Sequence, residues 1–179
     1  MHIEPLREVS EEDVRRLIVG YSTSETYRYT KTETRERTEI VFELQQQPFE
    51  KRFPLPSTMI AYYRKIVRNG LSFEAIEDDA SIGLTIADTQ WNDIVIVWEL
   101  HVDAAYRRRG IGRSLLSAVE NAAREKGLRM VSIETQSSNV PAIDFYRACG
   151  YGIGAIDTAF YSNDDAARGE VGVFMRKAL

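Results

Sequence analysis

The sequence predicts a mixed α/β (α+β) fold in a single domain. The first observation is two closely spaced strands, 71–77 and 81–89, whose short acidic connection is typical of a hairpin turn. The second is residues 94–102, whose first half is apolar on both faces and therefore indicates a central strand covered on both sides. The third is the helical spacing of apolar residues in 112–126, directly after that strand.

The composition is that of a soluble globular protein. The chain has 179 residues, of which 44% are hydrophobic and 28% charged. A formal net charge of −4 argues against general nucleic-acid binding and is compatible with a cationic substrate. Cys149 is the only cysteine, which excludes an internal disulfide and favours a reducing compartment. With no secretory signal at its start and no apolar run long enough to cross a bilayer, we expect a cytoplasmic protein without a membrane partner.

The first 70 residues predict fewer regular elements than the rest. Residues 1–9 predict a short strand, and Ser10 predicts the start of a helix. Residues 22–53 are rich in Thr, Glu and Arg, and only the alternation in 40–44 indicates a half-exposed strand. Helical spacing returns in 59–67. The apolar face of the first helix is expected to contain Val14, Leu17, Ile18 and Tyr21.

We interpret residues 22–70 as a variable insert within the single domain 1–179. Their polar, Thr-rich composition fits either a cover over an acceptor site or a contact in a homodimer, and we expect the acceptor side. The remaining elements follow in the order strand 94–102, helix 112–126, strand 129–136, a helix from Asn139 to Cys149, and strands 152–161 and 170–177 around a polar loop.

A glycine-containing loop, Arg107-Arg108-Arg109-Gly110-Ile111-Gly112, lies between the central strand and the following helix. Backbone N–H groups of such a loop, together with the positive end of the helix dipole, favour binding of a phosphate. The dinucleotide fingerprint is absent because its third glycine position is Leu115, and no Gly-Lys-Ser/Thr motif for a nucleotide P-loop is present. The loop alone therefore predicts an anion site and leaves the ligand open.

A second motif follows, with Asn139, Ala142, Tyr146, Gly150 and Tyr151 at the spacing Asn-x-x-Ala-x-x-x-Tyr-x-x-x-Gly-Tyr. Together with Arg107, Gly110 and Gly112 of the first motif, it resembles the GCN5-related N-acetyltransferase (GNAT) superfamily. Shorter strings resemble the streptothricin and nourseothricin acetyltransferases within it: Trp91-Asn92, residues 139–142, residues 154–161 and, more loosely, residues 49–54.

The resemblance implies a mostly antiparallel central sheet with a splay between two central strands and helices on both faces. It implies acetyl-coenzyme A (acetyl-CoA) as cofactor, bound by a core of residues 71–178, and no metal. The strand edge at 100–102 would pair with pantetheine, and the amide of Leu100 is a candidate oxyanion donor. The cofactor-binding residues implied are Leu100, His101, Val102, Arg107, Arg108, Arg109, Gly110, Ile111, Gly112, Arg113, Asn139, Ala142 and Tyr146.

Two residues are candidates for catalysis. The resemblance makes Tyr146 the general acid for the leaving thiolate, while an aromatic core role is the alternative. Glu99 is the candidate base for the acceptor amine, and a purely attractive role toward a cation is the alternative. Strand alternation predicts that Glu99 and His101 share a face with Val95 and Val97. His101 is also a candidate proton shuttle or a structural histidine.

Acceptor-binding candidates are Trp91, Glu99, Asp157 and Tyr161. The structural alternatives are an aromatic plug between strands for Trp91, a turn residue for Asp157 and a strand partner for Tyr161. Cys149 is expected to be a buried small residue rather than a nucleophile. The expected reaction is direct acetyl transfer in a ternary complex to a small-molecule amine, with a streptothricin-like antibiotic as first choice. A polyamine, another small amine or a protein amino group is the competing acceptor, and a non-catalytic acetyl-CoA sensor is the alternative of another class.

Overall fold

The computed structural model describes all of residues 1–179, and the chain divides into two compact units. The first unit consists of Met1–Val19, Phe53–Ile133 and Lys177–Leu179. Its elements are β1 (His2–Pro5), α1 (Glu11–Leu17), α2 (Ser57–Ile66), the 3₁₀ turn η1 (Val67–Asn69), β4 (Phe73–Glu77), β5 (Ala80–Thr89), β6 (Ile94–Val102), the 3₁₀ turn η2 (Ala104–Tyr106), α3 (Ile111–Glu125) and the first part of β7 (Met130–Gln136).

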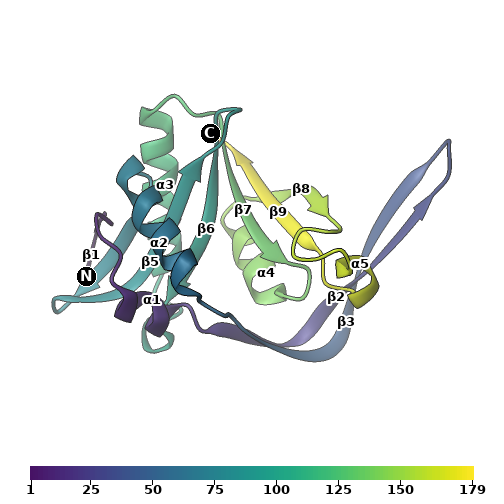
Figure 1. Ribbon diagram of the computed structural model, residues 1–179, viewed down its shortest axis with the longest axis horizontal. Helices are drawn as coiled ribbons and strands as arrows, with labels where there is room; N and C mark the ends of the chain where they lie inside the picture. The colour runs from purple at the N-terminus through teal and green to yellow at the C-terminus, as the bar shows by residue number, and fades with distance from the viewer. The chain divides into compact units, whose positions relative to one another are not determined.

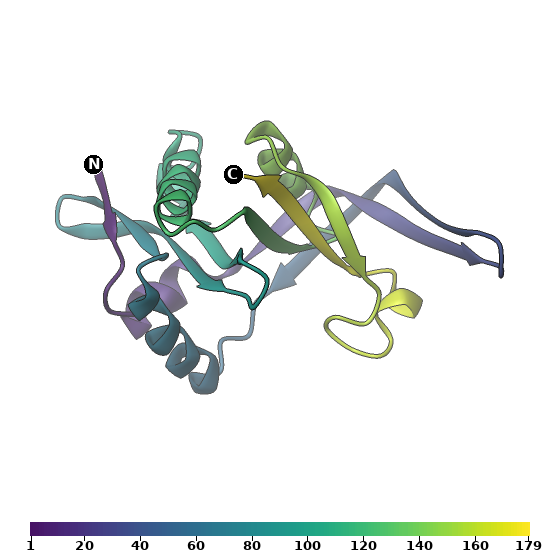
Figure 2. The same cartoon turned by 90° about the horizontal axis from the view of Figure 1, so that it is seen from above.

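The strands of the first unit lie in the order β1-β4-β5-β6-β7, antiparallel except for the parallel pair β6–β7. Helices α1 and α2 cover one face and α3 covers the other, as Figures 1 and 2 show. On the α1/α2 face, Leu84 and Ile86 pack with apolar residues of both helices. On the α3 face, Leu100 and Val102 pack with the cluster that contains Leu115. Burial of these side chains is the main force that fixes the three layers.

Strand β6 parts from β7 in its middle. The parallel pairing ends at Val97↔Ile133, although β6 continues to Val102. At the same place, Ile86 of β5 pairs with Glu99 and Ala87 pairs with Val97, so Trp98 is an extra residue that forms a β-bulge. The bulge turns the second half of β6, and its edge toward β7 carries no parallel ladder beyond Val97. The splay expected between two central strands involves segments of both units and stays a prediction.

The bulge corrects one prediction. Simple alternation placed Glu99 and His101 on the same face as Val95 and Val97. In the observed register Glu99 pairs with Ile86 and Val97 with Ala87, and these two neighbours on β5 point to opposite faces. Glu99 and His101 do share a face, but it is the α1/α2 face. An inserted residue shifts the alternation by one, which no periodicity argument detects.

The second unit consists of Gly20–Arg52 and Glu134–Arg176. Strand β9 (Gly172–Ala178) lies between the second part of β7 and β8 (Gly152–Asp157), with α4 (Val140–Ala148) between β7 and β8 in sequence and a short α5 (Asp165–Arg168) before β9. Strands β2 (Gly20–Glu33) and β3 (Thr38–Arg52) form a separate antiparallel hairpin. The far end of this hairpin extends past the rest of its unit (Figure 1).

Several predicted boundaries were wrong. Helix α1 ends at Leu17, and Tyr21 lies in β2. The predicted strand 40–44 is part of the fifteen-residue β3, and its partner β2 was not predicted. Strand β8 stops at Asp157, and the polar loop that follows contains α5. The hairpin was missed because most of its side chains are exposed, so it lacks the apolar face that alternation arguments need. None of the helices combines the length and apolar character that crossing a bilayer requires.

Candidate functional site

The glycine loop leads into α3 with backbone donors turned outward. The first bond of the helix runs from the Ser114 N–H to the Gly110 carbonyl, at 3.0 Å, so the helix itself does not use the N–H groups of residues 111–113. Gly110 is the N-cap with φ +83°, and Arg108 has φ +65°. A left-handed conformation costs a non-glycine residue about 1–2 kcal/mol, and such residues concentrate at functional sites. The backbone here is arranged to bind an anion.

The four arginines of this region have different surroundings. The Arg107 guanidinium donates through Nε to the carbonyl of Val102, at 3.1 Å, and so ties the loop to the end of β6. Arg109 makes two bonds to Glu77, at 2.9 and 3.2 Å, and lies 5.1 Å from the Tyr106 ring centroid. The side chains of Arg108 and Arg113 are exposed beside the donors of α3. A phosphate-containing ligand therefore fits this end of the helix.

The β6 edge beyond the bulge is the second feature that fits an extended ligand. The Leu100 and Val102 side chains pack on the α3 face, which holds the backbone of this half-strand in place. The parallel ladder of β6 with β7 ends at Val97, and β6 continues beyond it to Val102. An extended chain with amide groups, such as pantetheine, is able to pair with such an edge.

Glu99 lies in a cluster of its own on the α1/α2 face. The Tyr63 hydroxyl of α2 donates to Glu99 Oε1, and His101 Nε2 lies 2.7 Å from Glu99 Oε2. Because a carboxylate only accepts, His101 Nε2 carries the proton. The Phe53 ring meets the imidazole edge-on, with centroids 6.1 Å apart. The carboxylate remains 14% exposed, so it is held and still accessible. Sequence reasoning missed Tyr63 and Phe53, because no local pattern links them to β6.

The second motif forms α4 of the second unit. The Asn139 side chain accepts from the Ala142 N–H, at 3.3 Å, which confirms Asn139 as the N-cap. Tyr146 is 6% exposed and its ring lies 5.5 Å from Phe145 and 6.3 Å from Tyr151, centroid to centroid. Its environment is aromatic, as the core alternative expects, and the assignment of Tyr146 as general acid stays a prediction. Cys149 is buried at the end of this helix.

Tyr161 belongs to a polar network in the second unit. Its hydroxyl donates to Glu134, and the Lys51 ammonium lies 5.1 Å from its ring centroid and 2.6 Å from Glu170 Oε2. Burial raises the pKa of the Tyr161 hydroxyl, and the Glu134 carboxylate raises it further, so this hydroxyl keeps its proton. The network thus already holds one ammonium group between a carboxylate and an aromatic ring. Glu134, Glu170 and Lys51 were not predicted.

The same network extends to the hairpin. Ser138 Oγ donates its proton to Glu170 Oε1 at 2.7 Å. The Tyr21 hydroxyl lies 2.7 Å from Ser138 Oγ, and because the serine proton is already used, Tyr21 is the donor to Ser138. Burial raises the pKa of the Tyr21 hydroxyl, which keeps it protonated for this role. Asp157 has a local function, since it accepts from the Ala159 N–H at 3.0 Å in the turn after β8. The turn alternative for Asp157 is therefore present in the structure.

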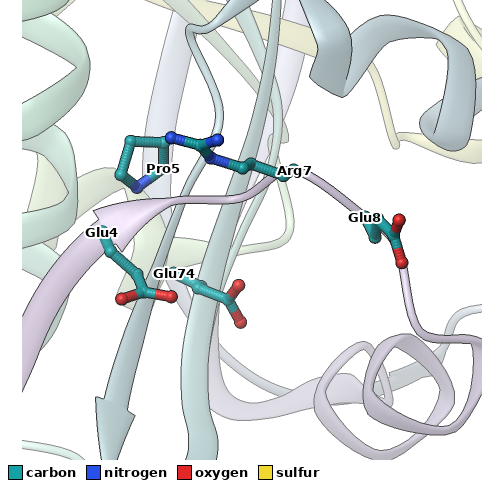
Figure 3. Close-up of a pocket in the computed structure, with 5 residues that line it drawn as sticks. All are labelled: Glu4, Pro5, Arg7, Glu8 and Glu74. Carbon is teal, nitrogen blue, oxygen red and sulfur yellow. The ribbon is translucent and has the colours of Figure 1, made fainter.

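Two remaining features belong to the first unit. Trp91 is in the β5–β6 turn with 95% of its surface exposed, so no pocket of its own unit encloses it. A hollow of about 300 Å³ is lined by Glu4, Pro5, Arg7, Glu8 and Glu74 at β1 and β4 (Figure 3). Burial raises the pKa of Glu74 there. None of the predicted site residues lines this hollow.

Comparisons with known proteins match the part of the chain that contains both sequence motifs. Residues 38–151, which include both motifs, match the sequence profile of the acetyltransferase (GNAT) family. A streptothricin acetyltransferase of Escherichia coli is 25% identical over 132 residues, 70% of this chain and 76% of the relative. Streptothricin acetyltransferase A of Bacillus subtilis (strain 168) is 27% identical over 136 residues, 70% of this chain and 75% of the relative.

A solved structure gives the same result for the fold. A protein of Bacillus anthracis (strain Ames), assigned as a streptothricin acetyltransferase and solved in complex with acetyl-CoA, has a TM-score of 0.74 against this chain. The two are 22% identical, and the likeness covers 99% of both chains. At this identity the likeness shows the fold, and the predicted fold class is confirmed.

Proposed function

The chain belongs to the acetyltransferase (GNAT) family and is an acetyl-CoA-dependent N-acetyltransferase, and we propose that its acceptor is a streptothricin-like antibiotic, acetylated on a lysine-type amine. The observation that carries the acceptor is that two relatives at 25% and 27% identity are streptothricin acetyltransferases. Such antibiotics carry several cationic amines. The network of Tyr161, Glu134 and Glu170, which already holds the Lys51 ammonium, supports recognition of such cations.

Acetyl-CoA would be held by three parts of this chain. The N–H groups of residues 108–113, with Arg108 and Arg113 beside them, would bind the pyrophosphate. The backbone of Leu100 and Val102 would pair with pantetheine, and Asn139 and Ala142 would contribute from α4. When bound, the cofactor supplies the acetyl group as a thioester. The outward donors of α3 and the ladder-free β6 edge fit this ligand.

Three residues have roles in the proposed transfer. Glu99 accepts a proton from the acceptor ammonium, whose intrinsic pKa is near ~10, so that the amine nitrogen becomes nucleophilic. The Leu100 N–H donates to the thioester oxygen as charge develops there. Tyr146 would donate its hydroxyl proton to the departing thiolate and regain one from the acceptor nitrogen, which gives up its second proton as the amide forms. We propose that residues 22–70 serve the acceptor side. Within the first unit this is supported by Phe53, which contacts His101, and by Tyr63, which donates to Glu99. We also propose a cytoplasmic location.

The test is incubation of the purified protein with acetyl-CoA and streptothricin, followed by mass spectrometry of the antibiotic. The expected result is a product heavier by one acetyl group. Acetylation of a polyamine or a protein amine in parallel incubations, with streptothricin unchanged, would assign a different acceptor. Tight acetyl-CoA binding without any acetylated amine would indicate a sensor.

A further inference from the structure

We infer that Tyr63 is a positioning residue for the Glu99 carboxylate: its hydroxyl fixes the orientation and the ionised state in which Glu99 accepts the proton of the acceptor amine. The inference rests on the proposed function in one respect, namely that Glu99 is the proton acceptor. Tyr63 belongs to neither of the two family motifs, and it comes from the part of the chain before residue 71. It adds a residue of α2 to a site otherwise built on β6.

Tyr63 itself is held firmly. It is only 4% exposed, and its ring packs in the apolar cluster between α1, α2 and the sheet, together with Ile60 and Ile66 of its own helix. A buried ring with two side-chain torsions leaves its hydroxyl little freedom, so the donor to Glu99 Oε1 has a defined position. Phenylalanine would keep the ring in the apolar cluster and remove the hydroxyl that donates to Glu99.

The Glu99 carboxylate is held from two directions. Tyr63 donates to Oε1 from α2, while His101 Nε2 lies 2.7 Å from Oε2 on the strand itself. The β-bulge at Trp98 is what brings Glu99 to the α2 face, because regular alternation would place it on the face of α3. Each oxygen keeps a further lone pair that can accept a proton.

The proton transfer then balances without involving the tyrosine proton. An N–H bond of the acceptor ammonium breaks, an O–H bond forms on Glu99, and the nitrogen lone pair becomes available. Tyr63 keeps its own proton and stabilises the ionised carboxylate before the transfer. The titratable groups that bond to Glu99 are Tyr63 from α2 and His101 from β6, while β5 presents Leu84 and Ile86 to this face.

The kinetic test compares Tyr63→Phe with Tyr62→Phe. Tyr62 is the neighbouring residue of α2 and is 42% exposed, so it is a matched control for loss of one hydroxyl. For Tyr63→Phe we expect the acid limb of kcat/KM to move up by about one pH unit, so that the rate falls about tenfold on that limb. The carboxylate has lost a donor to its ionised form, so activity should recover at high pH. Tyr62→Phe should keep the wild-type profile.

A second measurement needs no acceptor. The chain has only two histidines, His2 and His101, so ¹⁵N spectra can follow the His101 ring directly. Wild type and Tyr62→Phe should show a fixed Nε2–H tautomer, and Tyr63→Phe a mixture, because the carboxylate is no longer held. A mixture seen while streptothricin is not acetylated would support the positioning role and reject only the acceptor. An unchanged His101 spectrum in Tyr63→Phe, or a loss of rate equal at every pH, would overturn the inference.

Discussion

The loop at the start of α3 (residues 107–113), which we propose as an anion cradle, and the β2–β3 hairpin are built in different ways. In the cradle, the donors belong to consecutive residues, and one glycine at φ +83° sets their direction. The hairpin instead meets its unit through contacts between residues far apart in sequence, such as Tyr21 with Ser138 and Lys51 with Glu170, which are 117 and 119 positions apart. The first region depends on backbone geometry, which a short motif encodes, and the second depends on side-chain pairs, which no short motif encodes.

The largest effect on function should follow from blocking the cradle. Gly110→Glu puts a carboxylate and a strained backbone at the N-terminal end of α3, where we propose that the anion binds. We expect acetyl-CoA affinity, measured by calorimetry, to fall at least about 100-fold, which is about 2.7 kcal/mol of binding free energy. Gly127→Glu is the matched control: Gly127 follows the other end of the same helix, also with positive φ (+71°), and a Cβ there meets nothing within 4 Å. Equal affinities for both variants would contradict the cradle assignment.

Tyr146→Phe tests the second motif. If its hydroxyl protonates the leaving thiolate, turnover should fall about 100-fold while acetyl-CoA affinity stays within about twofold. Tyr151→Phe removes a hydroxyl from the neighbouring ring and should leave turnover nearly unchanged. A Tyr146→Phe enzyme with normal turnover would leave only the aromatic core role for this side chain.

The loop before α3 and the β2–β3 hairpin also show which features can be predicted from the sequence alone. The elements from β4 to α4 were predicted with the correct order, and Asn139 caps its helix as expected, because caps and apolar periodicity are local signals. Tyr63, Glu134 and Lys51 were not found as site residues, since each reaches its partner only after the chain has folded. The bulge at Trp98 was invisible for a further reason, because it changes the register and leaves the composition of the strand unchanged.

The comparison extends to stability. Leu115 of α3 is fully buried, whereas Leu44 of the hairpin is 50% exposed. Leu115→Ala should lower the free energy of unfolding by about 2–5 kcal/mol, through lost burial and a cavity. Leu44→Ala should change it by less than about 0.5 kcal/mol in the same denaturant titration. A large loss for Leu44→Ala would mean that this part of the hairpin is covered in solution, for example by a second copy of the chain.

The smallest effect concerns Asp165, in the loop that follows Tyr161. Burial of Asp165 raises the pKa of its carboxyl group. Hydrogen bonds from the Ser162 hydroxyl, at 2.7 Å, and from the Tyr161 N–H, at 2.6 Å, have the opposite effect and are stronger. The pKa of Asp165 therefore lies below its ordinary value. A lowered pKa in the folded state adds stability that is present above about pH 4 and is lost as the pH falls through the folded value.

Asp165→Asn should therefore cost about 1 kcal/mol at pH 7, and its unfolding free energy should approach that of the wild type in strong acid. Asp164→Asn is the control, because Asp164 is exposed and its ion pair with Arg168, at 3.7 Å, is a surface pair. If Asp165→Asn were as stable as Asp164→Asn at pH 7, the loop would not depend on this carboxylate. Tyr161 would then owe its position to Glu134 and Lys51, which are the long-range contacts that distinguish this region from the cradle.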